Sequence, residues 1–180
     1  LPRDYPLACY SLTGYSGGGK KMIAEYESPQ RDPRLDGPAP YALGLQHKHL
    51  PEMQKIAGLS FPPNFLPVLG DVYQGMTTCV MLQNRLLNGT PGAEDIRDLL
   101  DNYYQDQKLV HVAPFGGTEP RLYTTQLSGR DTLELTVSGN GEQTLLSAQF
   151  DNLGKGASGA AVQNMNIMLG FEETTGLSVE

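Results

Sequence analysis

The alternation of apolar and polar positions along the chain predicts its first elements. Residues 6–15 are mainly apolar and aromatic and run into a glycine cluster at 17–19, which favours a strand that ends in a turn. Residues 20–26 have the composition of a helix. Residues 28–40 contain four prolines and several charges without a hydrophobic period, so we expect an exposed loop there.

The next segment mixes extended and helical signals. Residues 41–46 are predicted to run extended into His47. A helix is expected at residues 50–56, because Pro51 suits the first helical turn. Prolines break residues 61–67, so no regular element is expected there.

A long strand and a surface helix follow. Residues 73–87 are rich in β-forming side chains and are predicted to form a central strand. Residues 93–104 carry apolar side chains at Ile96, Leu99 and Leu100, which predicts a helix with one buried face.

The remaining elements decide the fold class. Further strands are expected at residues 109–114, 133–138 and 144–151. The last two are joined by Gly139-Asn140-Gly141, a favourable hairpin turn, and residues 157–169 form a mainly apolar closing helix. Strands outnumber helices and follow one another directly. The sequence therefore predicts an α+β domain over residues 1–180, with a mixed, largely antiparallel sheet covered by helices.

Composition limits the classes of function. A chain of 180 residues with 39% hydrophobic residues can bury one core, and a net charge of -7 argues against nucleic-acid or anionic-membrane partners. No stretch approaches the roughly 18 apolar residues of a membrane span. Cys9 and Cys79 lack a metal or disulfide spacing, which fits a reducing cytoplasm. Because Leu1 is not an initiator Met, we expect a processed or truncated chain.

The first candidate site is the glycine turn that contains Ser16, Gly17 and Lys20. A strand that delivers a hydroxyl and several outward backbone N–H groups to a helix start forms an anion site, and lysine adds positive charge. A phosphate or carboxylate would suit it. A plain structural turn explains the same glycines and is the more frequent meaning of such a motif.

The second candidate site combines Tyr41, His47, His49 and Glu52. One imidazole would act as acid or base while Glu52 orients a ring, and a spacing of two places both rings on one side of an extended segment. A metal pair lacks a third ligand nearby, and a surface His-Lys-His run is the alternative. His111 stands alone and is expected to be a packing or edge residue.

The third string begins at Asp151 and Asn152 and continues through small residues into the closing helix. Small residues permit close backbone approach, either to another helix or to a cofactor, and the Asn152 amide is suited to recognise another amide. From these residues alone, helix packing is the simpler explanation.

In this order the three strings resemble the N-acetyl-gamma-glutamyl-phosphate reductase family over essentially the whole chain. The matching strings are Thr13 to Lys20, Tyr41 with His47 to Glu52, and Asp151 to Gln163. Their Gly-Gly-Gly-Lys and His-Lys-His-Leu-Pro-Glu versions point to the shorter subclass. Thr13 stands where the family usually has Ser, and a hydroxyl is kept. The resemblance implies a domain like the C-terminal domain of glyceraldehyde-3-phosphate dehydrogenase.

The resemblance also implies a reaction and roles. The reaction is NADPH-dependent reductive dephosphorylation of N-acetyl-L-glutamyl 5-phosphate to its semialdehyde, in arginine biosynthesis, through a thioester on cysteine. His47 would activate that cysteine, and Asn152 would face the nicotinamide end of NADP. The substrate would be held by Ser16, Gly17, Lys20, Tyr41, His49 and Glu52.

The resemblance places the nucleophile outside this chain. Cys9, in Ala-Cys-Tyr, echoes the family's Gly-Cys-Tyr but lies in the strand before the glycine turn, whereas the family's nucleophile would precede Leu1. Cys79 belongs to a core strand. We therefore expect this chain alone to be inactive and to lack the nucleotide-binding half, against which the terminal helix at residues 157–170 would pack.

Two alternatives stay open at this point. In the first alternative, the segment is an oligomerisation module whose sheet face pairs subunits while the chemistry resides elsewhere. In the second alternative, the chain belongs to a related enzyme that reduces an aspartyl phosphate or an aminoadipyl derivative. The closing Asp-Asn-Leu-x-Lys-Gly string disfavours the aspartyl case.

Overall fold

Seven strands form one sheet in the order β2-β3-β1-β4-β7-β6-β5. The computed structural model describes residues 1–117 and 120–179. The strands are β1 (Ala8–Gly14), β2 (Ala39–Pro40), β3 (Asn64–Gly70), β4 (Met76–Gln83), β5 (Val110–Val112), β6 (Leu133–Gly139) and β7 (Gln143–Phe150). The α-helices are α1 (Gly19–Tyr26), α2 (Leu50–Ile56), α3 (Ala93–Tyr104) and α4 (Gly159–Leu169). Short 3₁₀ helices lie at η1 (Tyr15–Gly18), η2 (Pro33–Asp36) and η3 (Asn84–Leu86), and a π-helix at η4 (Gly154–Ser158).

The sheet is mixed and largely antiparallel, as predicted. β1 pairs with β3 and β5 pairs with β6 in parallel, whereas β4 pairs antiparallel with both β1 and β7. β4 is the central strand, which confirms the prediction for this part of the chain. The β6–β7 hairpin is also confirmed: the N–H of Asn140 donates to the carbonyl of Gln143.

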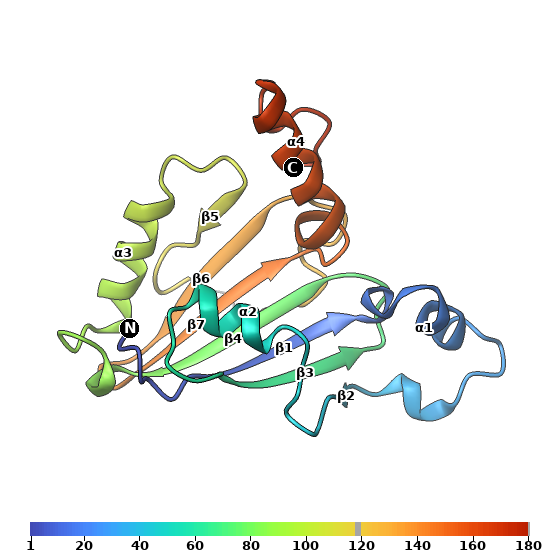
Figure 1. Cartoon of the computed structure of the whole chain (residues 1–180), viewed down its shortest axis with the longest axis horizontal. Helices are drawn as coiled ribbons and strands as arrows, with labels where there is room; N and C mark the ends of the chain where they lie inside the picture. The colour runs from blue at the N-terminus through green and yellow to red at the C-terminus, as the bar shows by residue number, and fades with distance from the viewer. Residues whose placement is uncertain (118–119, 180) are drawn as a thin grey trace.

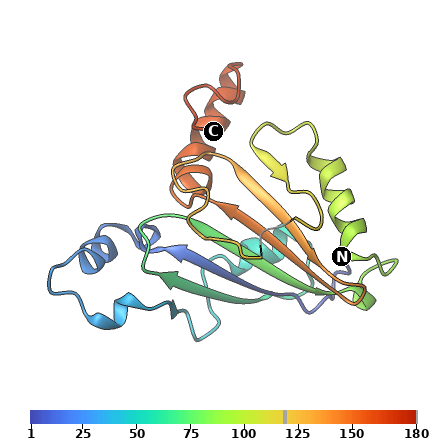
Figure 2. The ribbon, with the colours of Figure 1, turned by 180° about the vertical axis from the view of Figure 1, so that it is seen from behind.

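Helices α2 and α3 lie on one side of the sheet. Figure 1 shows α2 in front of the strands, and Figure 2, from behind, shows the strands in front of α2. Cys9, Ser11 and Thr13 of β1 alternate with Tyr10 and Leu12, so the two sets point to opposite faces. On the face away from α2, Figure 2 shows no helix crossing the strands in the described part of the chain.

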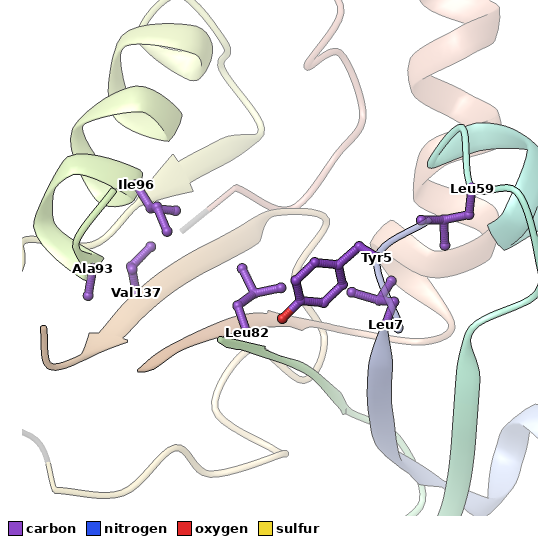
Figure 3. Packing of buried hydrophobic residues seen from close by; sticks show 7 residues of the cluster. All are labelled: Tyr5, Leu7, Leu59, Leu82, Ala93, Ile96 and Val137. Carbon is purple, nitrogen blue, oxygen red and sulfur yellow. The ribbon is translucent and has the colours of Figure 1, made fainter. Parts of the chain in front are cut away.

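The hydrophobic core lies between the sheet and α3. Ala93 and Ile96 of α3 point toward Val137 of β6, and the Tyr5 ring lies between Leu82 and Leu7 (Figure 3). The buried residues of this core are Tyr5, Leu7, Leu59, Leu82, Ala93, Ile96 and Val137. The Tyr5 hydroxyl is satisfied because it accepts a hydrogen bond from the backbone N–H of Gln83.

Helix α3 has the predicted bounds, but one of its apolar positions was assigned to the wrong face. Ile96 is buried and Leu100 packs against the core, whereas Leu99 is 67% exposed. Ile96 and Leu100 are four residues apart and share one side of the helix, and Leu99 is rotated out of that narrow stripe.

The prediction that prolines break residues 61–67 was wrong, because β3 begins at Asn64 and contains Pro67. The Pro67 carbonyl accepts the N–H of Tyr41, which places its backbone polar atoms on the side away from β1. β2 covers only two positions on that side, so the missing proline N–H disrupts no long ladder.

The segment before His47 is not extended, contrary to the prediction for residues 41–46. Ala42 and Leu45 have φ values of 52° and 54°, and the N–H of Leu45 donates to the carbonyl of Ala42. The chain therefore turns twice before it enters α2, whose bounds match the predicted helix. Positive φ at two non-glycine residues is a tertiary effect that composition does not reveal.

The closing helix begins with a π-helical turn rather than directly at residue 157. A Cβ on Gly159 would lie 2.0 Å from an Asp131 carboxylate oxygen, and one on Gly154 would lie 2.7 Å from the Arg130 carbonyl. These glycines are therefore required by close packing at this end of the sheet. Helix α4 ends at Gly170, which has φ of 74°.

The outer side of α4 carries several exposed apolar side chains: Met165, Ile167, Met168 and Leu169, followed by Phe171. Such a patch agrees with a helix that packs on a further partner. Within residues 1–117 and 120–179, no helix has the length and apolar character needed to cross a membrane.

Candidate functional site

A cavity of about 630 Å³ lies where β1 ends and α1 begins. Its sheet side is formed by Ser11, Thr13, Phe65, Pro67, Leu69 and Phe150. It brings together six of the eight predicted site residues, namely Ser16, Gly17, Tyr41, His47, His49 and Asn152. The glycine turn, the histidine pair and the Asn152 segment, far apart in sequence, thus line one space.

The glycine turn is shaped by sterics. Ser16 is 5% exposed within η1 and lines the cavity. A Cβ on Gly18 would lie 2.3 Å from the Met22 sulfur, and Gly19 has φ of 73°, which favours glycine. The stacked rings of Tyr15 and Tyr26, with centroids 4.5 Å apart, hold α1 against the turn.

The first backbone N–H groups of this turn bond within the protein, before the glycine cluster at 17–19 is reached. The N–H groups of Gly14, Tyr15 and Ser16 donate to the carbonyls of Gly75, Val72 and Tyr73 at 2.9, 2.9 and 3.1 Å. These bonds tie the turn to the β3–β4 loop. The Ser16 hydroxyl is a polar side-chain group of the turn at the cavity.

His47 sits in a small aromatic cluster. Its ring centroid lies 5.9 Å from Tyr41, 5.1 Å from His49 and 5.2 Å from Phe65. The two imidazoles are neighbours, as the spacing predicted, but a turn rather than an extended segment brings them together. The N–H of His49 donates to Nδ1 of His47 over 3.3 Å.

The surroundings of His47 favour its neutral form. Burial lowers the pKa of His47 below its ordinary value, and electrostatic interaction with the nearby His49 and Lys48 lowers it further. A neutral imidazole that accepts at Nδ1 carries its proton on Nε2. His47 is thus a neutral side chain with a hydrogen-bond donor at Nε2.

Two predicted residues lie outside the cavity lining. Glu52 stands in the first turn of α2, and its Oε2 lies 3.5 Å from Nδ1 of His49, which agrees with an orienting contact to a ring. Lys20 is exposed in α1, next to Gly19 at the cavity edge.

Asp151 and Asn152 connect the end of β7 to three other segments. The Asp151 carboxylate, 1% exposed, accepts hydrogen bonds from Gln74 Nε2 at 2.7 Å, Gly129 N at 2.5 Å and Leu153 N at 2.8 Å. The Asn152 amide accepts from the Gly75 N–H and donates to Ser16. Asp151 is therefore structural, whereas Asn152 reaches the cavity.

Neither thiol is placed for chemistry at this cavity. Cys9 and Cys79 are buried and absent from its lining. Burial raises the pKa of Cys9 to about 11, so its thiolate is scarce at neutral pH. Cys79 lies near Ser147 Oγ on the opposite face of the sheet. The interpretation of Cys9 as a buried strand residue is confirmed.

The charge of the cavity differs from that of the chain. Its described lining holds Lys48, His47 and His49 but no carboxylate, although the net charge of the chain is -7. Sequence reasoning gave no role to Lys48 or to the hydroxyls of Ser11 and Thr13. The i, i+2 spacing of those two hydroxyls in β1 was a usable signal for a polar strand face.

Other features of the described residues do not compete with this site. Across residues 1–117 and 120–179, no three His, Cys, Asp or Glu side chains gather in a way that could hold a metal ion. A second cavity, of about 530 Å³, lies on the opposite sheet face beneath the loop that contains Leu122 and Thr124. His111 is exposed in the edge strand β5, as expected.

Residues 1–152 match the protein family described as "Semialdehyde dehydrogenase, dimerisation domain". The chain is 42% identical over 190 residues to N-acetyl-gamma-glutamyl-phosphate reductase 2 of Nostoc sp., a match that covers 98% of this chain and 58% of that protein. It is 44% identical over 182 residues to N-acetyl-gamma-glutamyl-phosphate reductase 2 of Pseudomonas putida, covering 98% and 57%. The chain thus spans less than two thirds of these relatives.

Solved structures share the fold. Aspartate semialdehyde dehydrogenase II from Vibrio cholerae superposes with a TM-score of 0.68 at 20% identity, covering 91% of this chain and 54% of that one. A probable aspartate-semialdehyde dehydrogenase from Pseudomonas aeruginosa gives a TM-score of 0.64 at 19% identity, with the same coverage. At these identities the likeness concerns architecture.

Proposed function

Because the chain belongs to the semialdehyde dehydrogenase dimerisation-domain family, we propose that it forms the substrate-binding and subunit-contact part of an N-acetyl-gamma-glutamyl-phosphate reductase. The reaction is the NADPH-dependent conversion of N-acetyl-L-glutamyl 5-phosphate to N-acetyl-L-glutamate 5-semialdehyde, with release of phosphate, in arginine biosynthesis. The observation that carries this proposal is the single cavity shared by Ser16, His47 and Asn152. A biosynthetic reductase of this kind works in the cytoplasm, and we propose that location.

The cavity is suited to an anionic acyl phosphate. Lys48 and the two histidines supply positive or donor groups, and no carboxylate of the described lining opposes an anion. The Ser16 hydroxyl, beside Gly17, provides a donor for a phosphate or carboxylate oxygen. Tyr41 and His49 would close the other side, with Glu52 orienting His49. Lys20 would reach the anion from the start of α1.

His47 would activate the nucleophile. A thiolate accepts hydrogen bonds, so the Nε2–H of neutral His47 would stabilise it and increase the fraction of reactive sulfur. Because Cys9 and Cys79 are buried away from the cavity, this thiol would come from the portion of the protein beyond this chain. The coverage of only 57% to 58% of the relatives leaves room for such a portion.

The cavity also has room for the nicotinamide end of NADP beside Asn152. Gly156 and Ala157 line the cavity there and carry no side chain beyond Cβ, so a flat ring can approach the backbone closely. Bound NADPH would supply the hydride for the reduction. Most of the nucleotide would be held outside this chain, and the exposed apolar side of α4 would pack on that nucleotide-binding part.

Subunit contact is the second role of the domain. The family is described as a dimerisation domain, and we propose that the helix-free sheet face pairs two copies. Tyr10, Leu66 and Met81 expose apolar surface on that face.

The test uses a two-domain version, in which the upstream part of the Nostoc protein precedes Leu1. We expect phosphate-dependent reduction of NADP with N-acetyl-L-glutamate semialdehyde, and little with aspartate semialdehyde. The 180-residue chain alone should be inactive. A preference for aspartate semialdehyde would assign the chain to a related enzyme. A protein that binds NADP but reduces neither substrate would favour the oligomerisation module.

A further inference from the structure

The Asn152 side chain bridges two loops at the cavity. Its Oδ1 accepts a hydrogen bond from the N–H of Gly75 at 2.8 Å, and its Nδ2 donates to Oγ of Ser16 at 3.0 Å. A backbone N–H can only donate, so the amide oxygen must face Gly75 and the amide nitrogen must face Ser16. The amide orientation is thus fixed by its partners.

This orientation fixes the direction of the hydrogen bond between Asn152 and Ser16. An amide NH₂ group can only donate, so Ser16 Oγ acts as the acceptor in this bond. The hydroxyl has one hydrogen, and the Asn152 bond is the only side-chain hydrogen bond of Ser16 within the described part of the chain. Since Ser16 is nearly buried and lines the cavity, its remaining hydrogen is available to a bound ligand.

Asp151 holds the backbone next to this bridge in place. The carboxylate binds the side chain of Gln74 and the N–H of Gly129, so the backbone next to Asn152 cannot shift without breaking buried hydrogen bonds. Gln74 precedes Gly75, the residue that orients the Asn152 oxygen. One network therefore positions both partners of the amide.

We propose that Asn152 is a positioning residue that leaves the Ser16 hydroxyl hydrogen free to donate to an anionic oxygen of the substrate. This inference rests on the proposed function, because it concerns hydrogen bonding in the same cavity. The second hydrogen of Nδ2 stays available to a cofactor amide. The anionic oxygen belongs to either the phosphate or a carboxylate of the substrate, and separate titrations distinguish the two.

Asn152→Asp tests the assignment with almost no change of shape. One carboxylate oxygen still accepts the Gly75 N–H, but the other accepts the Ser16 hydrogen and turns it away from the cavity. We expect the dissociation constant of the anion that Ser16 contacts to rise about tenfold or more. The titrations use inorganic phosphate and N-acetyl-L-glutamate with the 180-residue chain. Asn88→Asp, in an exposed turn, is the matched control and should bind like the wild type.

A double-mutant cycle separates this role from the added charge and from a purely structural one. Asn152→Ala should weaken binding about tenfold in the wild type but less than about twofold in a Ser16→Ala background, because its partner is already lost. Ser16→Thr, which keeps the hydroxyl, should retain binding. Effects of Asn152→Ala and Ser16→Ala that multiply independently would overturn the inference.

The outcomes also separate the inference from the proposed function. A wild-type chain that binds neither anion contradicts the proposed function itself. A wild-type chain that binds an anion, with Asn152→Asp equally tight, contradicts only the inference. Should the Asn152 variants lose their fold, the side-chain amide signals of Asn152 in the wild type and in Ser16→Ala give a ligand-free measurement by NMR. One of its two protons should shift upon Ser16→Ala, and unchanged signals would refute the bridge.

Discussion

The backbone N–H of His49 lies 3.3 Å from Nδ1 of His47, measured between the nitrogens, and donates a hydrogen bond to it. The contact joins neighbours in the chain, yet it determines which imidazole nitrogen faces a ligand as a donor. Combined with the lowered pKa of His47, it gives a neutral ring whose Nε2 carries hydrogen at neutral pH. The first two predictions concern this ring.

Replacing His47 by Asn in the two-domain version should reduce kcat about 10²-fold or more, because the nucleophile loses its imidazole partner. Steady-state NADP reduction with the semialdehyde measures it. His111→Asn, on the exposed edge strand β5, is the control and should be normal. Full turnover in the His47 variant would remove this residue from the mechanism.

The pKa of His47 should lie below about 6.5 in an NMR titration of the chain, because burial and the neighbouring His49 and Lys48 disfavour its charged form. Lys48→Met should raise that pKa. The folded-state pKa lies below the unfolded one, so the unfolded chain takes up the proton first on acidification. The stability that His47 contributes is present above about pH 6.5 and is lost as pH falls through the folded pKa. A folded-state pKa above about 6.5 would contradict this prediction.

Neither cysteine should react with iodoacetamide in the folded chain, and both should react in guanidinium chloride, as followed by mass spectrometry. The reason is burial, which raises the pKa of Cys9 to about 11 and blocks access to both sulfurs. Cys9→Ala in the two-domain version should keep normal turnover. Fast labelling of folded Cys9, or loss of turnover in that variant, would reinstate Cys9 as a candidate nucleophile.

Asp151→Ala should lower the free energy of unfolding by about 3 kcal/mol or more, because it removes a buried carboxylate that accepts three hydrogen bonds. Denaturant titration of the chain measures the loss. Asp106→Ala, in an exposed loop, serves as the control and should change stability by less than about 0.5 kcal/mol. Equal stability of the two variants would show that the buried network is dispensable.

The chain should sediment as a dimer, and Met81→Glu should shift it to a monomer, because a charge would be buried when two sheet faces pair. Leu99→Glu places the same charge on the exposed side of α3 and should leave the dimer intact. Dimers that survive Met81→Glu but not Leu99→Glu would move the subunit contact to the helical side.

Elements with strong local signals were predicted from sequence. The β6–β7 hairpin and α3 are specified by turn glycines and by helical periodicity, and both lie where expected. β3 was missed because Pro67 is acceptable only next to a two-residue edge strand, which the sequence did not reveal. Residues 41–46 were misassigned because positive φ at Ala42 and Leu45 is imposed by the fold.

The site was partly predictable because its motifs, like the hairpin and α3, are local in the sequence. The structure brings Ser16, His47 and Asn152 to one cavity. The sequence did not reveal that the β3–β4 loop, distant in sequence, accepts hydrogen bonds from the N–H groups of Tyr15 and Ser16, and the predicted backbone anion site stays a prediction. Lys48 was not predicted as a site residue, because its position in the sequence does not indicate that it lines the cavity.

The hydrogen bond between Ser16 and Asn152 joins positions 136 residues apart, so the cavity cannot form until residue 152 has been translated. When the glycine turn leaves the ribosome, the amide that directs its hydroxyl has not yet been translated. A nascent chain that stops short of β7 contains β1, β3 and β4 but lacks the Asn152 amide that donates to Ser16. The Ser16 hydroxyl therefore acquires its Asn152 partner only after residue 152 has been synthesised.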